Sequence, residues 1–492
     1  MKMLMLNLDG DGPLHRQTYR ALRGAILSGR LRSGLRLPSS RNLAKELGLS
    51  RNTVLQAFEQ LVAEGYSITR PGSGTFVADS LPRRARDGTP LKQQVERQPA
   101  RLSAMGRRIA ANIPPGAASW SVPRESLRYD FRYGEPAYAD LPLETWTRLL
   151  GRRARRLSVR RLAYQPPGGA RELREALADY LARARGVVCE PEQVLIVQGS
   201  QQAIDLCVRL LVDPGDTVVL EEPHYTGFSF CLTAAGANVV HVPVDEEGLQ
   251  VDALASIDRA SLACVTPSHQ FPAGGVLPLH RRLALLDWAQ RSGAYLLEDD
   301  YDGEFRYDSR PLECLQSLDR DGRVIYVGTA SKILFPALRI GWIVAPHSLV
   351  RAFHDAKAIS DTGTASLEQL AFADFISEGH LERHVRRARQ RHAVRRQALL
   401  AAVADELGER AQVIGTGAGI HAVLRFASLP MHRVNRLRAA CRERDVGVYP
   451  VAPFYADPPK RAELLLGYAS LAAEDIHIGI RRLREALDSM GK

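Results

Sequence analysis

Lys332 combines a primary amine with hydroxyl and guanidinium groups that lie close by in the chain. Thr329 and Ser331 offer two hydroxyls beside the amine, and Arg339 follows seven residues later. Such an amine forms an imine with an aldehyde, and the planar fork of a guanidinium binds a phosphate through two hydrogen bonds. The chain has 7 lysines and 59 arginines, so a lysine here indicates a need for amine chemistry. The stretch suits a phosphorylated aldehyde, and the alternative is an ordinary surface lysine.

Two predicted strands would carry the groups around this lysine. The apolar run Val324 to Val327 reads as a short buried strand that ends at Gly328, just before the lysine. Residues 294–301 form a second strand pattern, which ends in three acids and a tyrosine. Buried acids are costly unless they meet a cation, a hydrogen-bond donor or a metal. A ring nitrogen that must stay protonated is such a partner, because a carboxylate beside it keeps the ring an electron sink. A divalent metal is the competing interpretation, and no further ligand cluster supports it.

Three other junctions between strands and loops place polar or aromatic side chains where a ligand could bind. After the apolar run 194–197, a glycine-containing turn opens a helix whose free N–H groups and Ser200 hydroxyl would bind a phosphate. Tyr225 ends the next strand pattern and either stacks on a flat ring or serves as a core residue. A third pattern is followed by a polar loop that contains His269 and Gln270.

The first 79 residues predict a small DNA-binding head. Ser39 and Ser50 can each cap a helix, and a turn at Gly48 joins the two helices into a helix-turn-helix. Residues 51–53 then lie on the first turn of the second helix, where a recognition helix meets base edges and phosphates. The turn Pro71–Gly74 joins two short strand patterns into a hairpin, the wing. The alternative is a small helical domain with solvated arginines.

The distribution of charge agrees with this division of the chain. Residues 1–125 carry 20 basic and 9 acidic groups, whereas the remaining residues carry 46 of each. Such asymmetry is typical of a nucleic-acid-binding head on a neutral body, although a basic solvated face has the same charge. From residue 126 onward, strand-like and helix-like segments alternate, which predicts an α/β sheet with crossovers. Residues 80–125 are rich in proline and arginine and read as a linker, which either follows the DNA backbone or acts as a tether alone.

The cysteines and the N-terminus bear on the cellular compartment. The six cysteines lie far apart and form no C-x-x-C pair, so we expect buried reduced thiols in a cytoplasmic protein without a metal site. No apolar run approaches the roughly 18 residues of a membrane span. The N-terminus is too short and too soon acidic for a signal peptide.

The head also carries a specific set of strings. The string L-P-S-S-R-x-L-A-x-E-L-G-x-S-R-x-T-V is followed by E-G-Y and by G-S-G-T-F-V. This set resembles the GntR family of winged helix-turn-helix repressors and spans nearly the whole head. The resemblance implies double-stranded promoter DNA as a partner. The residues that it would place against DNA are Arg41, Ser50, Arg51, Asn52 and Thr53, with Gly74 in the wing.

Five strings follow in order in the body: G-S-Q-Q, E-E-P-x-Y, T-P-S-H-Q-F-P, E-D-D-Y-D-G-E-F and T-A-S-K-x-x-x-P-x-x-R-x-G. Together they resemble fold type I aminotransferases, which bind pyridoxal 5′-phosphate, and with the head they look like the MocR/GabR group of transcriptional regulators. The resemblance implies a winged helix-turn-helix (α+β) head and an α/β aminotransferase-like body with a smaller C-terminal α+β subdomain from about residue 346 to 492. We expect the head at 1–79, the linker at 80–125 and the body at 126–492.

The resemblance also assigns roles around the cofactor. Lys332 would form the Schiff base, Asp299 would meet the pyridine nitrogen, and Tyr301 would meet the ring hydroxyl. Tyr225 would stack on the ring. The residues that would hold the phosphate are Ser200, Gln201, Ser331 and Arg339.

Three further positions follow from the same resemblance. His269 or Gln270 lies near the place where aminotransferases carry an asparagine for the ring hydroxyl, and the sequence leaves the choice open. Tyr164 resembles the tyrosine that reaches the phosphate of the neighbouring subunit, so we expect a homodimer. Aminotransferases end with an arginine that binds the substrate α-carboxylate, and Leu465 stands in the matching stretch. A leucine cannot pair with a carboxylate, which puts ordinary transamination of α-amino acids in doubt.

The sequence therefore favours a transcription factor whose body senses pyridoxal phosphate, alone or with an amine or amino acid effector. The second hypothesis is a working aminotransferase with a regulatory DNA-binding head, and aminotransferase-type chemistry stays open. A third is a DNA-binding protein whose body is a dimerisation scaffold. Leu465 favours sensing over turnover.

Overall fold

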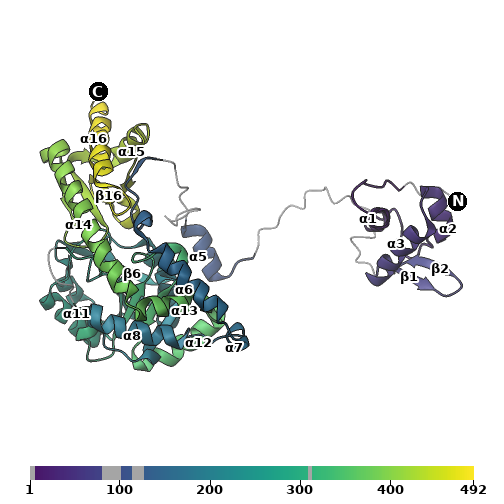
Figure 1. Ribbon diagram of the computed structural model, residues 1–492, viewed down its shortest axis with the longest axis horizontal. Coiled ribbons are helices and arrows are strands. Elements are labelled where there is room, and N and C mark those ends of the chain that lie inside the picture. Colours follow the sequence, from purple (N-terminus) through teal and green to yellow (C-terminus); the bar gives the residue numbers. More distant parts are fainter. Residues whose placement is uncertain (1–5, 80–100, 114–126, 308–312, 492) are drawn as a thin grey trace. The chain divides into compact units, whose positions relative to one another are not determined.

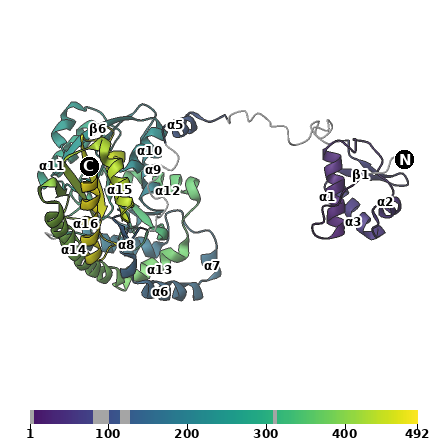
Figure 2. The same ribbon diagram turned by 90° about the horizontal axis from the view of Figure 1, so that it is seen from above.

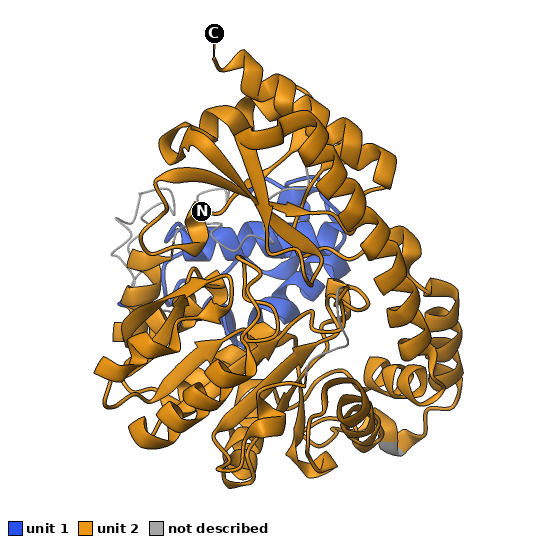
Figure 3. Ribbon diagram, turned by 90° about the vertical axis from the view of Figure 1, so that its left-hand side faces the viewer, with its two compact units in different colours: residues 1–101 blue, residues 102–492 orange. Residues whose placement is uncertain are grey.

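The computed structural model describes residues 6–79, 101–113, 127–307 and 313–491. The chain divides into two compact units, residues 1–101 and 102–492, which Figure 3 colours separately. Among the described residues, no helix has both the length and the apolar character that crossing a membrane requires.

The head is built from three helices and a hairpin. Ser39 accepts a hydrogen bond from the N–H of Asn42 and so caps the second helix, as Ser50 caps the third by accepting from the N–H of Thr53. Leu22, at the centre of the first helix, is fully buried against the other two. The predicted winged helix-turn-helix is confirmed. Its elements are α1 (Leu14–Leu27), α2 (Ser40–Leu47), α3 (Arg51–Ala63), β1 (Ser67–Arg70) and β2 (Gly74–Val77).

The body contains a large mixed sheet between two layers of helices (Figure 1). Its eight strands run in the order β4-β11-β10-β9-β8-β5-β6-β7, and the neighbouring pairs from β10 to β6 are parallel. The carboxyl ends of these parallel strands therefore share one edge, where the predicted polar residues meet. The strands are β4 (Val194–Val197), β5 (Thr217–Glu222), β6 (Asn238–Asp245), β7 (Gly248–Leu249), β8 (Leu262–Val265), β9 (Tyr295–Asp300), β10 (Val324–Thr329) and β11 (Gly341–Val344).

Successive residues of each strand bury against opposite helical layers, as the strand period requires. On β4, Ile196 packs in the layer of α8 and α13, whereas Val197 packs in the layer of α9, α10 and α12. Phe353 of α12 and Phe375 of α13 belong to these two layers, so the chain does not leave the large sheet at the expected boundary near residue 346. The helices are α6 (Leu143–Arg155), α7 (Val159–Leu162), α8 (Arg171–Arg185), α9 (Ser200–Leu211), α10 (Thr226–Ala235), α11 (Leu279–Ser292), α12 (Val350–Asp361) and α13 (Ser366–Ser377).

A smaller C-terminal subdomain has its own sheet and core. Helix α14 (His380–Leu407) runs into it from the layers of the large sheet (Figure 1), with Leu381 in one core and Leu399 in the other. Strand β3 (Tyr129–Asp130), near the start of the body, pairs with β14 and adds Phe131 to this C-terminal core. The other elements are β12 (Ala411–Ile414), β13 (His421–Pro430), α15 (Val434–Arg442), β14 (Val446–Gly447), β15 (Tyr449–Pro450), β16 (Arg461–Gly467) and α16 (Ala473–Ser489).

One helix forms inside the stretch expected to be linker. Helix α5 (Ala104–Asn112) is capped by Ser103 and packs beside α10, within the second unit (Figure 2). The rest of the expected linker, 80–100 and 114–125, lies outside the described residues.

Candidate functional site

A cavity of about 680 Å³ opens at the shared carboxyl edge of the large sheet. Its walls come from the ends of β9 and β10, the first turn of α9, the loop after β3 and the start of β13. This convergence joins segments that lie far apart in the chain. The lining side chains used below are Arg132, Tyr133, Glu135, Ser200, Gln201, Tyr225, Phe271, Asp299, Tyr301, Thr329, Ser331, Lys332, Arg339, His421 and Tyr449.

Lys332 lies just after β10 and points its amine across the cavity. Its Nζ donates a hydrogen bond to the carbonyl oxygen of Gly134 at 2.7 Å. Gly134 has a φ of +74°, and a side chain there would begin 2.9 Å from Nζ, so a glycine leaves room for the amine. Burial lowers the pKa of Lys332, and the carboxylates of Asp302 and Asp299 partly oppose this effect. The neutral, nucleophilic amine is therefore more accessible than in an exposed lysine.

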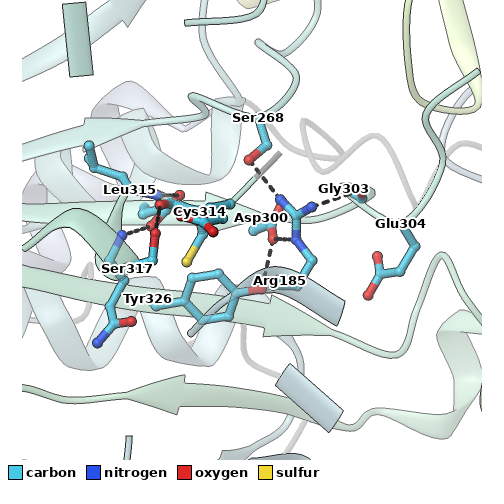
Figure 4. Close-up of polar contacts among 12 residues, drawn as sticks. Arg185, Ser268, Asp300, Gly303, Glu304, Cys314, Leu315, Ser317 and Tyr326 are labelled. Atoms are coloured by element: carbon cyan, nitrogen blue, oxygen red, sulfur yellow. Dashed lines mark hydrogen bonds and ion pairs between the residues drawn. The ribbon is translucent and has the colours of Figure 1, made fainter. Parts of the chain in front are cut away.

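Of the three acids at the end of β9, Asp299 lines the cavity. Its neighbours point to the opposite face of the sheet, where Glu298 accepts two backbone N–H groups and Asp300 pairs with Arg185 at 2.6 Å (Figure 4). Tyr326 also donates to Asp300, at 2.7 Å. Asp299 Oδ1 is buried without a hydrogen-bond partner among the described residues. Burial raises the pKa of Asp299 to about 7, with a further contribution from Asp300.

The opposite end of the cavity collects donors for an anion. Gly199, with a φ of +81°, precedes the first turn of α9 and leaves room for the guanidinium of Arg339, which a side chain there would meet at 2.8 Å. Arg339 donates to the carbonyl of Gln198 at 2.5 Å, so part of its fork is fixed. The Thr329 hydroxyl donates to Ser331 at 3.0 Å. Helix N-termini with nearby hydroxyls and arginine bind phosphate.

Aromatic rings form the wall between these two ends. Tyr225 contacts Phe271 edge-on at 6.0 Å, and its hydroxyl lies 3.4 Å from Gln201 Oε1. Phe271 also meets Tyr301 edge-on at 5.8 Å. His421 stacks near Tyr301 at 6.3 Å, and burial lowers its pKa well below the usual value, so the imidazole is neutral. A flat apolar ring system fits this wall.

The structure separates His269, Gln270 and Phe271. Gln270 does not line the cavity, because its amide donates to Glu221 and two backbone carbonyls and accepts from Ala273, which braces the loop. The expectation that Gln270 contacts a ring hydroxyl is therefore wrong. His269 does not line the cavity either. The next residue, Phe271, lines the cavity instead, and its side chain has no polar group.

His269 instead lies behind Tyr301. Its Nδ1 is 2.9 Å from the Tyr301 hydroxyl and 3.1 Å from a carboxylate oxygen of Asp302. Burial and the charge of Asp302 raise the pKa of Tyr301, so the phenol keeps its proton. A His269 tautomer protonated at Nδ1 would donate to Asp302 and the phenol oxygen, which would leave Tyr301 to donate its own proton into the cavity.

Several lining residues were not found from the sequence, and one predicted residue lies elsewhere. Arg132, which pairs with Asp130 at 3.3 Å, and Tyr449 reach the cavity from the C-terminal subdomain side and belong to no recognisable string. His421 is a further case, at the start of β13. Tyr164 is 93% exposed and does not line its own subunit's cavity.

The head presents the predicted DNA-facing residues on one end of α2 and α3. Arg41, Arg51 and Asn52 are exposed. Ser50 is exposed too, but its hydroxyl is engaged, since it accepts from the N–H of Thr53 at 3.1 Å and lies 2.8 Å from the Thr53 hydroxyl. Capping is thus its first role. Gly74 of the wing has a φ of +109°, and the guanidinium of Arg36, a residue not predicted for this face, lies against it.

The residues of the body fit pyridoxal phosphate. A buried carboxylate oxygen without a partner among the described residues suits the protonated pyridine nitrogen, and the donor set around α9 suits the phosphate. Lys332 lies between them, where an aldehyde would meet its amine. The aromatic wall supplies the faces of the ring pocket.

Comparisons with known proteins agree with the two units. Residues 14–77 match the family of bacterial regulatory proteins of the GntR type, and residues 130–483 match aminotransferase class I and II. The chain therefore belongs to the MocR/GabR type of regulators, in which a GntR winged helix-turn-helix is fused to a fold type I aminotransferase body. The predicted family and fold class are confirmed.

Several curated relatives share this whole architecture. The chain is 40% identical to the probable rhizopine catabolism regulatory protein MocR of Rhizobium meliloti, over 99% of this chain and 97% of that protein. It is 33% identical to the pyridoxine biosynthesis transcriptional regulator PdxR of Corynebacterium glutamicum, over 86% and 85%. Among solved structures, the α-aminoadipate aminotransferase LysN of Thermus thermophilus is 31% identical with a TM-score of 0.68, covering 73% of this chain and 92% of its own.

Proposed function

We propose that this protein is a transcription factor that binds promoter DNA through its head and pyridoxal phosphate through Lys332 in its body. The observation that carries the proposal is the placement of one amine, one buried carboxylate oxygen without a described partner and one donor-rich helix end around a single cavity. The two relatives described above are named as regulators, which supports the same choice.

Each residue of the site then has a defined role toward one part of the cofactor. Pyridoxal phosphate, when bound, supplies an aldehyde that condenses with primary amines and a ring that withdraws electrons. Asp299 holds the proton on the pyridine nitrogen, and Tyr301 donates to the ring hydroxyl with His269 behind it. Tyr225 covers one face of the ring. The residues that bind the phosphate are Ser200, Ser331 and Arg339, with Thr329 and the first N–H groups of α9.

The effector is an amine without an α-carboxylate. Leu465 is fully buried in β16, opposite Val423, and packs with Phe271 and Tyr301. Among the described lining residues, the cation left after the cofactor takes Lys332 and Arg339 is Arg132. That guanidinium already pairs with Asp130 and stacks on Tyr449 at 5.4 Å. An arginine engaged in this way favours an amine ligand over a zwitterion, whose carboxylate would need a cation of its own.

The acting form is a homodimer. Tyr164 and the nearby apolar side chains of α7 are exposed to an extent that soluble surfaces seldom show, with Val159 at 85% and Leu162 at 71%. Ile359 of α12, at 86%, adds to this exposed set. A second copy covering these residues would bring Tyr164 to the neighbouring cavity.

Covalent attachment tests the proposal. Wild-type protein loaded with pyridoxal phosphate should give, after borohydride reduction, a pyridoxyl adduct on Lys332 in peptide mass spectra, and the ligand should change affinity for DNA. Lys332→Ala should lose both the adduct and the ligand response, because Lys332 is the lysine among the described lining residues of the cavity. If Lys332→Ala still formed a pyridoxyl adduct at another residue and its DNA affinity still changed with the ligand, the assignment of Lys332 would be contradicted. Lys460→Ala, whose lysine is exposed and does not line the cavity, is the control for general effects of removing a lysine.

Matched pairs of ligands test the effector class. Ethanolamine differs from serine, and cadaverine from lysine, by one carboxylate. We expect each amine to perturb the absorption of the loaded protein and its DNA affinity at roughly tenfold lower concentration than its amino acid partner, the loss expected when one charge-assisted hydrogen bond is missing. The opposite order would reject the class. Sustained conversion of amino and keto acids would instead support the aminotransferase hypothesis.

A further inference from the structure

Helix α10 connects the cavity with the chain segment that leads to the head. Tyr225, whose ring lines the cavity, occupies the N-cap position directly before the first residue of this helix. At its other end, Arg108 of α5 donates to the carbonyls of Ala234 and Ala235, both at 2.9 Å. These are terminal helix carbonyls, which carry the negative end of the helix dipole. One end of this short helix therefore lies at the aromatic wall of the cavity, and the other end contacts α5, which lies in the expected linker.

A second residue that lines the cavity also contacts α10. Gln201, on the first turn of α9, donates to the carbonyl of Gly227 at 3.3 Å and lies 3.2 Å from Cys231 Sγ. A side chain at Gly227 would clash with both Tyr225 and Gln201, so the three residues fit tightly. A ligand that displaces the Tyr225 ring or recruits the α9 turn acts on α10 directly.

Helix α5 makes only a weak contact with α10. The helix has nine residues and buries none of them, and its large apolar side chains Met105 and Ile109 are 40% and 41% exposed. Isolated helices shorter than about 12 to 15 residues are marginal in water, so α5 depends on its contact with the body. That contact centres on Arg108. Gly236 makes it possible, because a side chain there would begin 3.0 Å from the guanidinium carbon.

We infer that α5 is a releasable clamp through which the cavity controls the head. This inference rests on the proposed function and adds the route of regulation. A small shift of α10 moves the carbonyl of Ala234, of Ala235 or of both beyond hydrogen-bonding distance of Arg108. Helix α5, which has nine residues and no buried side chain, then dissociates from α10. Release frees residues 102–113 from the body, and these residues by themselves amount to about 40 Å of fully extended chain between the head and the body. The half-sites that two heads can reach together change accordingly.

Two neighbouring arginines allow a matched test in the full-length protein. Arg108→Gln removes the clamp, whereas Arg107→Gln is the control, since Arg107 donates to Leu102 within its own segment. In protein without cofactor, amide hydrogen exchange over residues 104–112 should be about tenfold or more faster in Arg108→Gln than in wild type or in Arg107→Gln. Equal exchange in all three proteins would overturn the clamp, and this readout needs neither cofactor nor DNA.

The second readout is DNA affinity with and without pyridoxal phosphate, on a duplex selected from random-sequence DNA by the wild-type protein. Arg108→Gln should bind the cofactor normally in a spectral titration yet show the same DNA affinity with and without it, and Arg107→Gln should respond like wild type. A full response in Arg108→Gln would overturn the inference. A wild type that binds the cofactor and DNA without any coupling would overturn the proposed sensing function itself, and the clamp as its route.

Discussion

The carboxyl of Asp299 places a buried oxygen at the cavity that has no hydrogen-bond partner among the described residues. Its neighbours on β9 each have donors, whereas its own Oδ1 has none among the described residues. Holding such an oxygen away from water costs stability, which the nearby charge of Lys332 offsets only in part. The Asp299 carboxyl is therefore placed to bind a positively charged group.

A pH series on cofactor-free protein should expose this cost. Because burial raises the pKa of Asp299 to about 7, the folded state holds a proton that the unfolded state releases near pH 4. The wild type should therefore lose stability as pH rises through this window and level off above it. Relative to Asp299→Asn, its free energy of unfolding should fall by about 3 kcal/mol between pH 5 and pH 8. Chemical unfolding at each pH measures the difference.

The control for that series is Asp252→Asn, which changes an exposed acid on the same body. A profile for Asp299→Asn that changes with pH no more than the profile of Asp252→Asn would mean that the Asp299 carboxyl finds a partner or water in solution. That result would contradict its assignment as the group that meets the pyridine nitrogen.

At the residue scale, the side chains that could be predicted are those at the ends of strand patterns. Lys332, Asp299, Tyr301 and Tyr225 each lie at or just beyond such an end, and all four line the cavity. His421 could not be predicted in this way, because it comes from the C-terminal subdomain and only tertiary packing brings it to the sheet edge. Gln270 misled for a physical reason, since a polar side chain in a buried loop can be fully used by the loop's own backbone.

At the scale of elements, α8 is joined to β9 by a buried ion pair. The side chains of Arg185 and Asp300 are each 1% exposed, and Ser268 and Gly303 accept further hydrogen bonds from the guanidinium (Figure 4). Tyr326 of β10 donates to the same carboxylate. This cluster fixes the strand that carries Asp299, so its integrity sets the position of the binding carboxyl.

Removing one partner of this pair should be expensive. Arg185→Leu leaves the buried Asp300 without its cation, and we expect the free energy of unfolding of the body to fall by about 3 to 5 kcal/mol. Arg183→Leu, on the same turn of α8, should cost less than about 1 kcal/mol, because exposed pairs contribute little. The Arg183 side chain is 61% exposed in its pair with Glu382. Denaturant titration compares the two, and similar losses would refute the role given to the buried pair.

The elements themselves were largely predictable, since the alternation of strand and helix patterns gave the sheet. Two features were not. Helix α5 lies in a stretch whose composition is that of a linker, and it forms because Ser103 caps it and Arg108 finds the end of α10. The C-terminal subdomain begins later than expected, because α12 and α13 use their apolar faces on the large sheet.

At the scale of the whole molecule, the excess positive charge belongs to the first quarter of the chain. A basic head on a neutral body predicts DNA binding that weakens steeply with salt. Arg51 is one of these basic residues, and it is exposed on the first turn of α3 beside Ser40.

Charge reversal at Arg51 tests the docking of the head. Arg51→Glu should weaken binding to DNA and reduce the slope of log affinity against log salt by about 1 or more, as one phosphate contact is lost. Fluorescence anisotropy over a salt series measures both quantities. Arg291→Glu, which changes an exposed side chain on α11 of the body, should leave the slope unchanged. An unaltered slope for Arg51→Glu would remove α3 from the interface.

The hydrogen bond from Lys332 to Gly134 also joins two halves of the body. Lys332 follows a strand of the large sheet, whereas Gly134 follows β3, which pairs with β14 and belongs to the C-terminal core. The amine is thus a latch across the crevice between the two halves. If Lys332 held the proposed cofactor, its Nζ would give up the hydrogen bond to Gly134, and the two halves of the body would lose this contact.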